Sequence, residues 1–156
     1  MLRVAAIAAI ALVVAGCGGG KSGPGYNFTL PADWHQLSSV PAGVDAAYER
    51  NDTKVVMTIR KNPRVPVISH RFIHSLDVEF GKRLKGYVPL ADRIVVTKAG
   101  PVFFFAYTQK NVGRLTSIVL VPAHGFSYVL YFVSDPRSKA ARQDMAEVIH
   151  SFAPTS

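Results

Sequence analysis

The segment Val102–Tyr107 is apolar at every position. Successive side chains of a β-strand point to opposite faces of the sheet, so a strand of this kind needs apolar cover on both faces. Phe126–Val133 likewise carries apolar residues on both alternating faces. The two segments therefore predict central strands of a sheet that helices cover in front and behind.

Two segments have the apolar spacing of helices that could supply this cover. The first follows Ser69, a suitable N-cap, and runs to about Lys85. Its stripe recurs every four residues and comprises Phe72, Leu76, Phe80 and Leu84, with Ile73 beside them. The second is predicted to begin at Asp135-Pro136, because aspartate is a good N-cap and proline is tolerated in the first turn. Its apolar face comprises Ala141, Met145, Val148, Ile149 and Phe152.

Turn residues divide the rest of the chain into further strand-like segments, which are 26–30, 34–37, 44–50, 54–60, 93–98 and 114–121. Tight turns between successive strands favour antiparallel pairing. The sequence therefore predicts an α+β fold in which an antiparallel sheet of about six to seven strands carries a helix on each face, an α/β/α sandwich. We find no internal repeat and no sign of a second domain.

The first 25 residues differ from the rest in composition. A basic start, Met1-Leu2-Arg3, precedes the apolar run Val4–Val14, which is the layout of a secretory signal. Val14-Ala15-Gly16-Cys17 resembles a bacterial lipobox, and this implies diacylglyceryl transfer to the Cys17 sulfur and cleavage just before it. The alternative is an ordinary secreted protein that buries Cys17, although the three glycines after Cys17 are a poor start for a core.

These features divide the chain into three parts. Residues 1–16 are the predicted lipoprotein signal peptide, residues 17–25 the lipidated Cys17 with a flexible Gly-rich tether, and residues 26–156 one domain. The predicted location is the cell membrane, with the domain lipid-anchored on the extracytoplasmic face. Cys17 is the only cysteine, so no intrachain disulfide is possible.

The net charge is +8, and much of it is concentrated in one segment. Residues 60–85 contain seven basic and two acidic side chains, a net charge of +5. On a tethered domain this segment would attract anionic lipid headgroups or an anionic wall polymer. The alternative is a solvated surface whose last cations complement a helix C-terminus. The candidate contacts with an anionic partner are Arg60, Lys61, Arg64, Arg71, Lys82 and Arg83. Nucleic acid is not expected as a partner, because the predicted location lies outside the cytoplasm.

No pattern in the chain predicts catalysis, a metal or a cofactor. Ala15–Ser22 fits a loose phosphate-loop pattern, but the Gly23-Pro24-Gly25 that follows it cannot open a helix. His70 and His74 lie four residues apart, with Asp77 one turn on, and could hold a divalent cation. They lie away from the apolar stripe, so exposed histidines without a metal are the simpler interpretation. No serine lies in a G-x-S-x-G turn, and no carboxylates form a recognisable acid–base pair.

The start of the predicted domain carries a family resemblance. Phe28–Trp34 (FTLPADW) resembles the F-x-L-P-x-x-W opening that is common in the PsbP-like (Mog/PsbP) superfamily. The order of strands and helices is also similar, as is the closing Ile149–Phe152, so the resemblance covers about residues 26–153. The superfamily includes photosystem extrinsic subunits, a Ran-binding nuclear-transport factor and bacterial lipoproteins. The resemblance implies a PsbP-like α/β sandwich and a role in binding or assembly.

We therefore expect a bacterial lipoprotein that acts as a non-catalytic binding or assembly accessory module of the cell envelope, with an envelope protein or an anionic polymer as its partner. The alternative is a carrier of a lipid or another apolar ligand in a pocket between sheet and helix. The aromatic residues of the predicted strands would fill the core in the first case and line that pocket in the second. They are Phe103, Phe104, Phe105, Tyr107, Phe126, Tyr128, Tyr131 and Phe132. The oligomeric state stays open.

Overall fold

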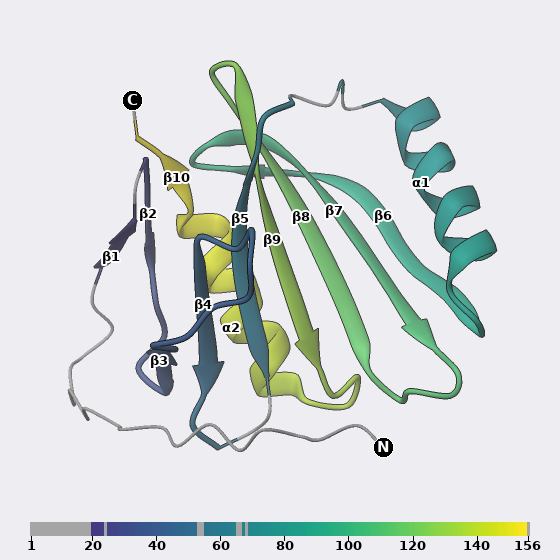
Figure 1. Cartoon of the computed structure of the whole chain (residues 1–156), viewed down its shortest axis with the longest axis horizontal. Helices are drawn as coiled ribbons and strands as arrows, with labels where there is room; N and C mark the ends of the chain where they lie inside the picture. The colour runs from purple at the N-terminus through teal and green to yellow at the C-terminus, as the bar shows by residue number, and fades with distance from the viewer. Residues whose placement is uncertain (1–19, 24, 53–54, 65–66, 68, 156) are drawn as a thin grey trace.

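The centre of the structure is a seven-stranded antiparallel sheet (Figure 1). The computed structural model describes residues 20–23, 25–52, 55–64, 67 and 69–155. The strands pair in the order β3-β4-β5-β9-β8-β7-β6. Their bounds are Trp34–Gln36 for β3, Ala46–Arg50 for β4, Val56–Asn62 for β5, Tyr87–Thr97 for β6, Gly100–Gln109 for β7, Leu115–Ala123 for β8 and Phe126–Ser134 for β9.

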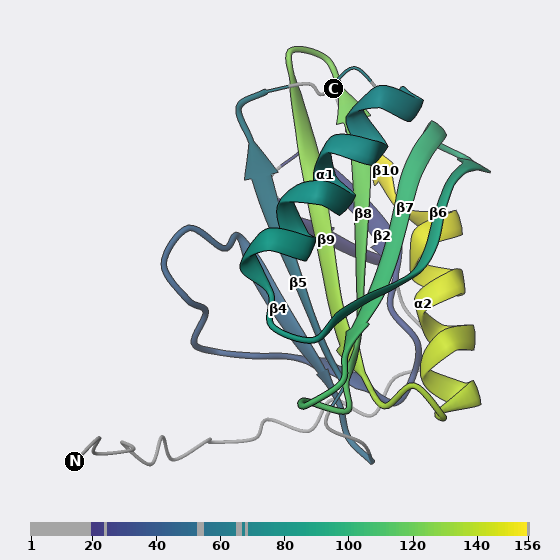
Figure 2. The same ribbon diagram turned by 90° about the vertical axis from the view of Figure 1, so that its right-hand side faces the viewer.

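One helix covers each face of this sheet (Figure 2). Helix α1 spans His70–Arg83 and helix α2 spans Lys139–Ser151. The predicted α+β fold, with an antiparallel sheet between two helices, is confirmed. The prediction that Val102–Tyr107 is covered on both faces is confirmed too, because every residue of this segment is buried. Its even-numbered residues belong to the core on the α2 side, and its odd-numbered residues belong to the core on the α1 side.

The two helix starts differ in how well the sequence predicted them. Ser69 caps α1 as expected, because its hydroxyl accepts a hydrogen bond from the Phe72 N–H at 3.2 Å. The predicted N-cap at Asp135 is wrong, since Ser138 caps α2 by accepting from the Ala141 N–H. The Asp135 carboxylate instead accepts from the Arg137 N–H at 2.8 Å, and the Asp135 carbonyl accepts from the Ser138 N–H at 3.1 Å. Asp135 therefore closes a turn that precedes the helix.

A second, small sheet brings the two ends of the described chain together. Its strands are β1 (Gly20–Gly23), β2 (Tyr26–Thr29) and β10 (Ala153–Pro154), in the order β1-β2-β10. Residues 20–23 were expected in the tether, and the structure pairs them with β2 through a turn in which Gly25 has φ +85°. The predicted signal peptide and Cys17 lie outside the described residues. In the part of the chain that is described, no helix has the length and hydropathy of a transmembrane span.

Candidate binding site on the α1 side of the sheet

Helix α1 covers only part of its face of the sheet. Its stripe packs on β7, where the Phe80 ring stacks on Phe105 and Tyr107 with centroid distances of 5.5 and 5.4 Å. The Phe72 ring meets Phe103 edge to face at 6.3 Å. The side chains of β8 and β9 that point to this face are therefore left beside the helix instead of beneath it.

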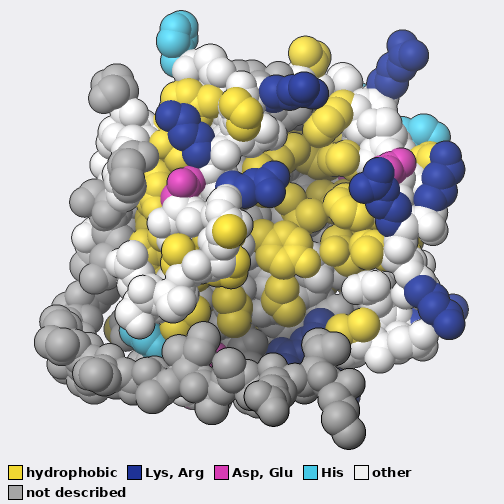
Figure 3. All heavy atoms as spheres, viewed as in Figure 1, with side chains coloured by type: hydrophobic (Ala, Val, Ile, Leu, Met, Phe, Trp, Pro, Cys, Tyr) yellow, Lys and Arg dark blue, Asp and Glu magenta, His cyan; other side chains and the backbone are white. Residues whose placement is uncertain are grey.

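A groove of about 440 Å³ follows from this incomplete cover. One wall is α1, and the floor consists of sheet residues from β7, β8 and β9. Side chains of β5 and of the connection after β5 form the other wall. The lining residues are Phe72, Leu76, Phe80, Phe103, Phe105, Ile118, Leu120, Val129, Arg60, Asn62 and Arg64. In the space-filling view, apolar side chains lie exposed in the middle of this face with Lys and Arg side chains around them (Figure 3). The volume is within the range of about 300–1,000 Å³ that is usual for small-molecule sites.

Strand register places Arg60 at the groove. Arg60 in β5 lies opposite Val129 in β9, and Val129 lies opposite Leu120 in β8. Leu120 in turn lies opposite Phe103 in β7. Residues opposite each other in adjacent antiparallel strands share one face of the sheet. One row of side chains therefore runs from a guanidinium group, across two aliphatic residues, to an aromatic ring under α1.

Arg64 is held at the same end of the groove by its backbone. The buried Ser127 hydroxyl of β9 donates to the Arg64 carbonyl at 2.8 Å. The Arg64 N–H donates to the Asn62 side-chain oxygen at 3.3 Å. Among the described residues, neither Arg60 nor Arg64 forms an ion pair. Two exposed cations therefore border an apolar groove whose described lining residues include no acidic side chain.

The tyrosines below α1 add no negative charge to this site. The pKa of Tyr107 is raised to about 12. Burial is the largest cause, and the hydrogen bond to Tyr131 and the charge of Tyr131 add to it. Burial also raises the pKa of Tyr87, helped by the hydrogen bond that its hydroxyl donates to the Asp77 carboxylate at 2.6 Å. Both phenols are therefore neutral at physiological pH.

The other predicted anionic-partner contacts lie apart from this pair of arginines. Lys61 follows Arg60 in β5 and points to the opposite face, where its ammonium group lies 3.9 Å from the centre of the Phe126 ring. Arg71, Lys82 and Arg83 are exposed on α1 and do not line the groove. Arg83 pairs with Glu79 one turn earlier in the helix. The structure thus brings together two of the six predicted residues, Arg60 and Arg64.

The histidine pair on α1 that could hold a cation has no third ligand nearby among the described residues. His70 and His74 are exposed on α1, whereas the Asp77 carboxylate is occupied by the Tyr87 hydroxyl. In the described parts of the chain, no three His, Cys, Asp or Glu side chains lie close enough together to hold a metal ion.

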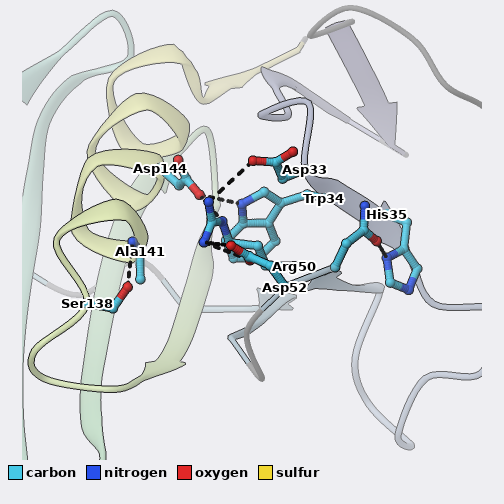
Figure 4. A network of polar contacts seen from close by, with 9 residues as sticks. Asp33, Trp34, His35, Arg50, Asp52, Ser138, Ala141 and Asp144 are labelled. Carbon is cyan, nitrogen blue, oxygen red and sulfur yellow. Dashed lines mark hydrogen bonds and ion pairs between the residues drawn. The ribbon is translucent and has the colours of Figure 1, made fainter.

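A polar cluster that the sequence did not reveal lies on the other side of the sheet (Figure 4). The Arg50 side chain in β4 is only 9% exposed and forms ion pairs with Asp33 at 3.3 Å, Asp52 at 2.7 Å and Asp144 at 2.8 Å. The Trp34 indole N–H also donates to Asp144, at 2.9 Å. Asp144 belongs to α2, so the cluster fastens this helix to β3 and β4. The cluster joins three separate stretches of the sequence, Asp33-Trp34, Arg50–Asp52 and Asp144, and no local pattern connects the three.

Comparison with known proteins identifies the fold. No protein-family model matches the chain, and no curated protein has a significant match. A solved structure of a Mog1 mutant is 11% identical with a TM-score of 0.59, covering 85% of this chain and 92% of the other. PsbP from the cyanobacterium Synechocystis is 16% identical with a TM-score of 0.56, covering 83% and 86%. LpqN from Mycobacterium tuberculosis, described as involved in cell envelope biogenesis, is 13% identical with a TM-score of 0.57, covering 85% and 86%. The chain therefore has a PsbP/Mog1-like fold, as the FTLPADW segment predicted.

Proposed function

We propose that this chain is a non-catalytic binding module of a bacterial cell envelope, held on the extracytoplasmic face of the membrane by a lipid on Cys17. Two observations support this role. Val14–Cys17 resembles a lipobox, and the fold is shared with LpqN, which is described as involved in cell envelope biogenesis. The groove beside α1 is the proposed binding site, and an anionic amphiphile is the proposed ligand.

The pairing of Arg60 and Arg64 with an apolar floor carries this proposal. A guanidinium group binds carboxylate or phosphate through two parallel hydrogen bonds, so the arginines would hold the anionic head of the ligand. Ile118, Leu120 and Val129 would bury its apolar chain beside α1. An anionic lipid of the envelope combines these two chemical features in one molecule.

Carriage of a purely apolar ligand is the second candidate, and the composition of the groove favours it. Eight of its eleven lining residues are apolar. A carrier of this kind would bind an alkyl chain without needing the two arginines. The two candidates therefore differ in how strongly binding depends on the charge of the ligand head.

The test titrates the protein with dodecyl phosphate and with the neutral dodecyl maltoside, using calorimetry. Replacing both groove arginines (Arg60→Gln with Arg64→Gln) is expected to weaken dodecyl phosphate binding at least tenfold and to change maltoside binding little. The matched control, Arg71→Gln with Lys82→Gln, removes the same charge from α1 outside the groove. It should change the affinity by no more than about twofold, because exposed charges act weakly at a distance through salt solution. Equal losses in both double variants would contradict a site at the groove.

A groove-filling variant separates the two candidates. Val129→Trp places a large ring on the floor, between Arg60 and Leu120. It should weaken both ligands if alkyl chains enter the groove. Tight maltoside binding that survives the loss of both arginines would favour the carrier.

The lipid anchor needs its own test, because it does not depend on the groove. Metabolic labelling with an alkynyl fatty acid should tag the native protein and fail to tag Cys17→Ala. Equal labelling of both proteins would rule out Cys17 as the attachment point.

A further inference from the structure

Ser117 in β8 is a buried polar group whose presence the fold does not explain. The residue is 1% exposed, and its hydroxyl has no hydrogen-bond partner among the described residues. Ser117 lies opposite Ala106 in β7 and Phe132 in β9, which both belong to the core on the α2 side. The hydroxyl therefore points toward α2, away from the groove with Arg60. Buried hydroxyl groups normally have a partner, so an unpaired one suggests that a ligand supplies it.

The Ser117 side chain contributes to the lining of a second cavity, of about 340 Å³. This cavity lies between α2 and the strands β6, β7 and β8. Its walls are mostly apolar and include Phe104, Leu115, Met145 and Ile149. It is large enough for a small molecule.

The rest of the lining gives the cavity a positive charge. Arg93 of β6 lies with its guanidinium carbon 5.3 Å from the centre of the Phe104 ring. Arg142 of α2 donates through Nη1 to the Pro136 carbonyl, and the exposed His150 lies on the same helix. None of the described residues that line the cavity is Asp or Glu. Arg93 forms no ion pair with any described residue, so it is available to an anionic group.

We propose that this cavity binds a small carboxylate with an apolar body that carries a hydroxyl or carbonyl group. The carboxylate pairs with Arg93, the apolar body packs on Phe104, Leu115 and Met145, and the oxygen atom of the body hydrogen-bonds to Ser117. The site is separate from the groove of the proposed function, because it lies on the opposite face of the sheet and shares no lining residue with it.

The experiment uses pairs of probes that differ by one hydroxyl. One pair is hydroxyphenylpropanoate and phenylpropanoate, and the other is octanoate with and without a terminal hydroxyl. Calorimetry should show that the native protein binds the hydroxylated member of at least one pair about three- to tenfold more tightly, which is the usual gain from one net hydrogen bond. Ser117→Ala should bind both members of that pair equally. A preference that persists in Ser117→Ala, or absence of binding by all four probes, would overturn the proposal.

Three further variants locate the site. Arg93→Gln should weaken both members of the preferred pair about tenfold, whereas Lys98→Gln, an exposed lysine outside the lining, should leave them unchanged. Ala146→Phe places a ring in the cavity from an exposed position of α2, so it should leave folding intact and abolish binding. Arg60→Gln with Arg64→Gln should have no effect here, so failure of this proposal is distinguishable from failure of the proposed function. Equal weakening by Arg93→Gln and Lys98→Gln would show that the probes are attracted only by the overall charge.

Discussion

The two helices cover the same sheet to different extents. Helix α2 buries Ala141, Val148 and Ile149. Its Asp144 forms an ion pair with Arg50 of β4 and accepts a hydrogen bond from Trp34 of β3, and these contacts fasten the helix to both strands. Its Ser151 hydroxyl also accepts from the Thr29 N–H at 2.9 Å. Within α1, all of which the structure describes, Ile73 is the one buried residue. The stripe of large apolar side chains on α1 is only half-buried. The hydrogen bond from the Tyr87 hydroxyl to Asp77 joins α1 to the start of β6.

The helices are also displaced from each other across the sheet. Helix α1 lies at the β6 edge of the sheet, whereas α2 runs behind β4, β5 and β9 (Figure 1), and residues of α2 also line a cavity with β6, β7 and β8. Each helix therefore leaves part of its face uncovered, and a cavity lies beside each helix: one over β5, β7, β8 and β9, the other over β6, β7 and β8. A sheet wider than a single helix therefore leaves room for a cavity on each face.

The largest expected contrast between the two faces comes from one phenylalanine on each. Phe152 is fully buried at the end of α2, with its ring 5.3 Å from Tyr26 and 5.5 Å from Tyr128. Phe152→Ala should lower the free energy of unfolding by about 4 kcal/mol, because it leaves a cavity in the main core. Phe72→Ala on α1 should cost about 1–2 kcal/mol, because this ring is already half-exposed. Urea unfolding followed by circular dichroism measures both, and equal losses would show that the two faces are packed alike.

The ion pairs provide the next contrast. Arg50→Met leaves Asp144, whose side chain is 17% exposed, without its cation, and should cost about 3 kcal/mol. The matched change on α1, Arg83→Met, breaks an exposed pair and should cost less than about 0.5 kcal/mol. Combining Arg50→Met with Asp144→Asn should recover part of the loss, because asparagine keeps an acceptor for the Trp34 indole and removes the uncompensated charge. The same unfolding measurement checks all three, and no recovery would mean that Arg50 acts mainly through packing.

The parts of the fold that were predictable are those that a short stretch of sequence determines. The uninterrupted apolar run Val102–Tyr107 requires cover on both faces, and the stripe through Phe80 with the cap at Ser69 defines α1. Local patterns also misled at Asp135, because Ser138 and Asp135 are both good caps and only the observed turn distinguishes them. The pairing of residues 20–23 with β2 was missed, since a glycine-rich segment lacks the β-branched and aromatic side chains that are typical of strands.

The candidate sites were predictable only in part. A basic segment with Arg60 and Arg64 was visible in the sequence, but its relation to the apolar floor depends on the register of β5 with β9. The unpaired Ser117 hydroxyl and the Arg50 cluster carry no local signal, because their surroundings come from strands and helices far apart in the chain. The part of the sheet that a helix leaves uncovered depends on how the strands and helices assemble, and a short stretch of sequence does not determine it.

The smallest expected effect tests whether α1 stays closed over its face at high pH. Tyr107 lies under α1, with its ring 5.4 Å from that of Phe80, and its pKa of about 12 exceeds the ordinary tyrosine value of about 10. Below pH 10 the phenol is protonated in both the folded and the unfolded state, so its full contribution to stability is present. Between about pH 10 and 12 the unfolded state loses this proton first, and the free energy of unfolding therefore falls as the pH rises. The free energy of unfolding of the native protein should therefore fall between pH 10 and about pH 11. Tyr107→Phe should make this fall smaller by up to about 1 kcal/mol.

The readout for this variant is the slope of stability against pH. Its absolute stability also changes, because the hydrogen bond to Tyr131 is lost. Urea unfolding at several pH values should give a shallower decline for Tyr107→Phe than for the native protein, although the other tyrosines with raised pKa values, such as Tyr26 and Tyr48 on the α2 side, still contribute. Identical slopes would mean that Tyr107 ionises near pH 10 in the folded protein, which requires water to reach it. Helix α1 would then open at alkaline pH while α2 remains in place, and the difference between the two faces would be greater than their packing indicates.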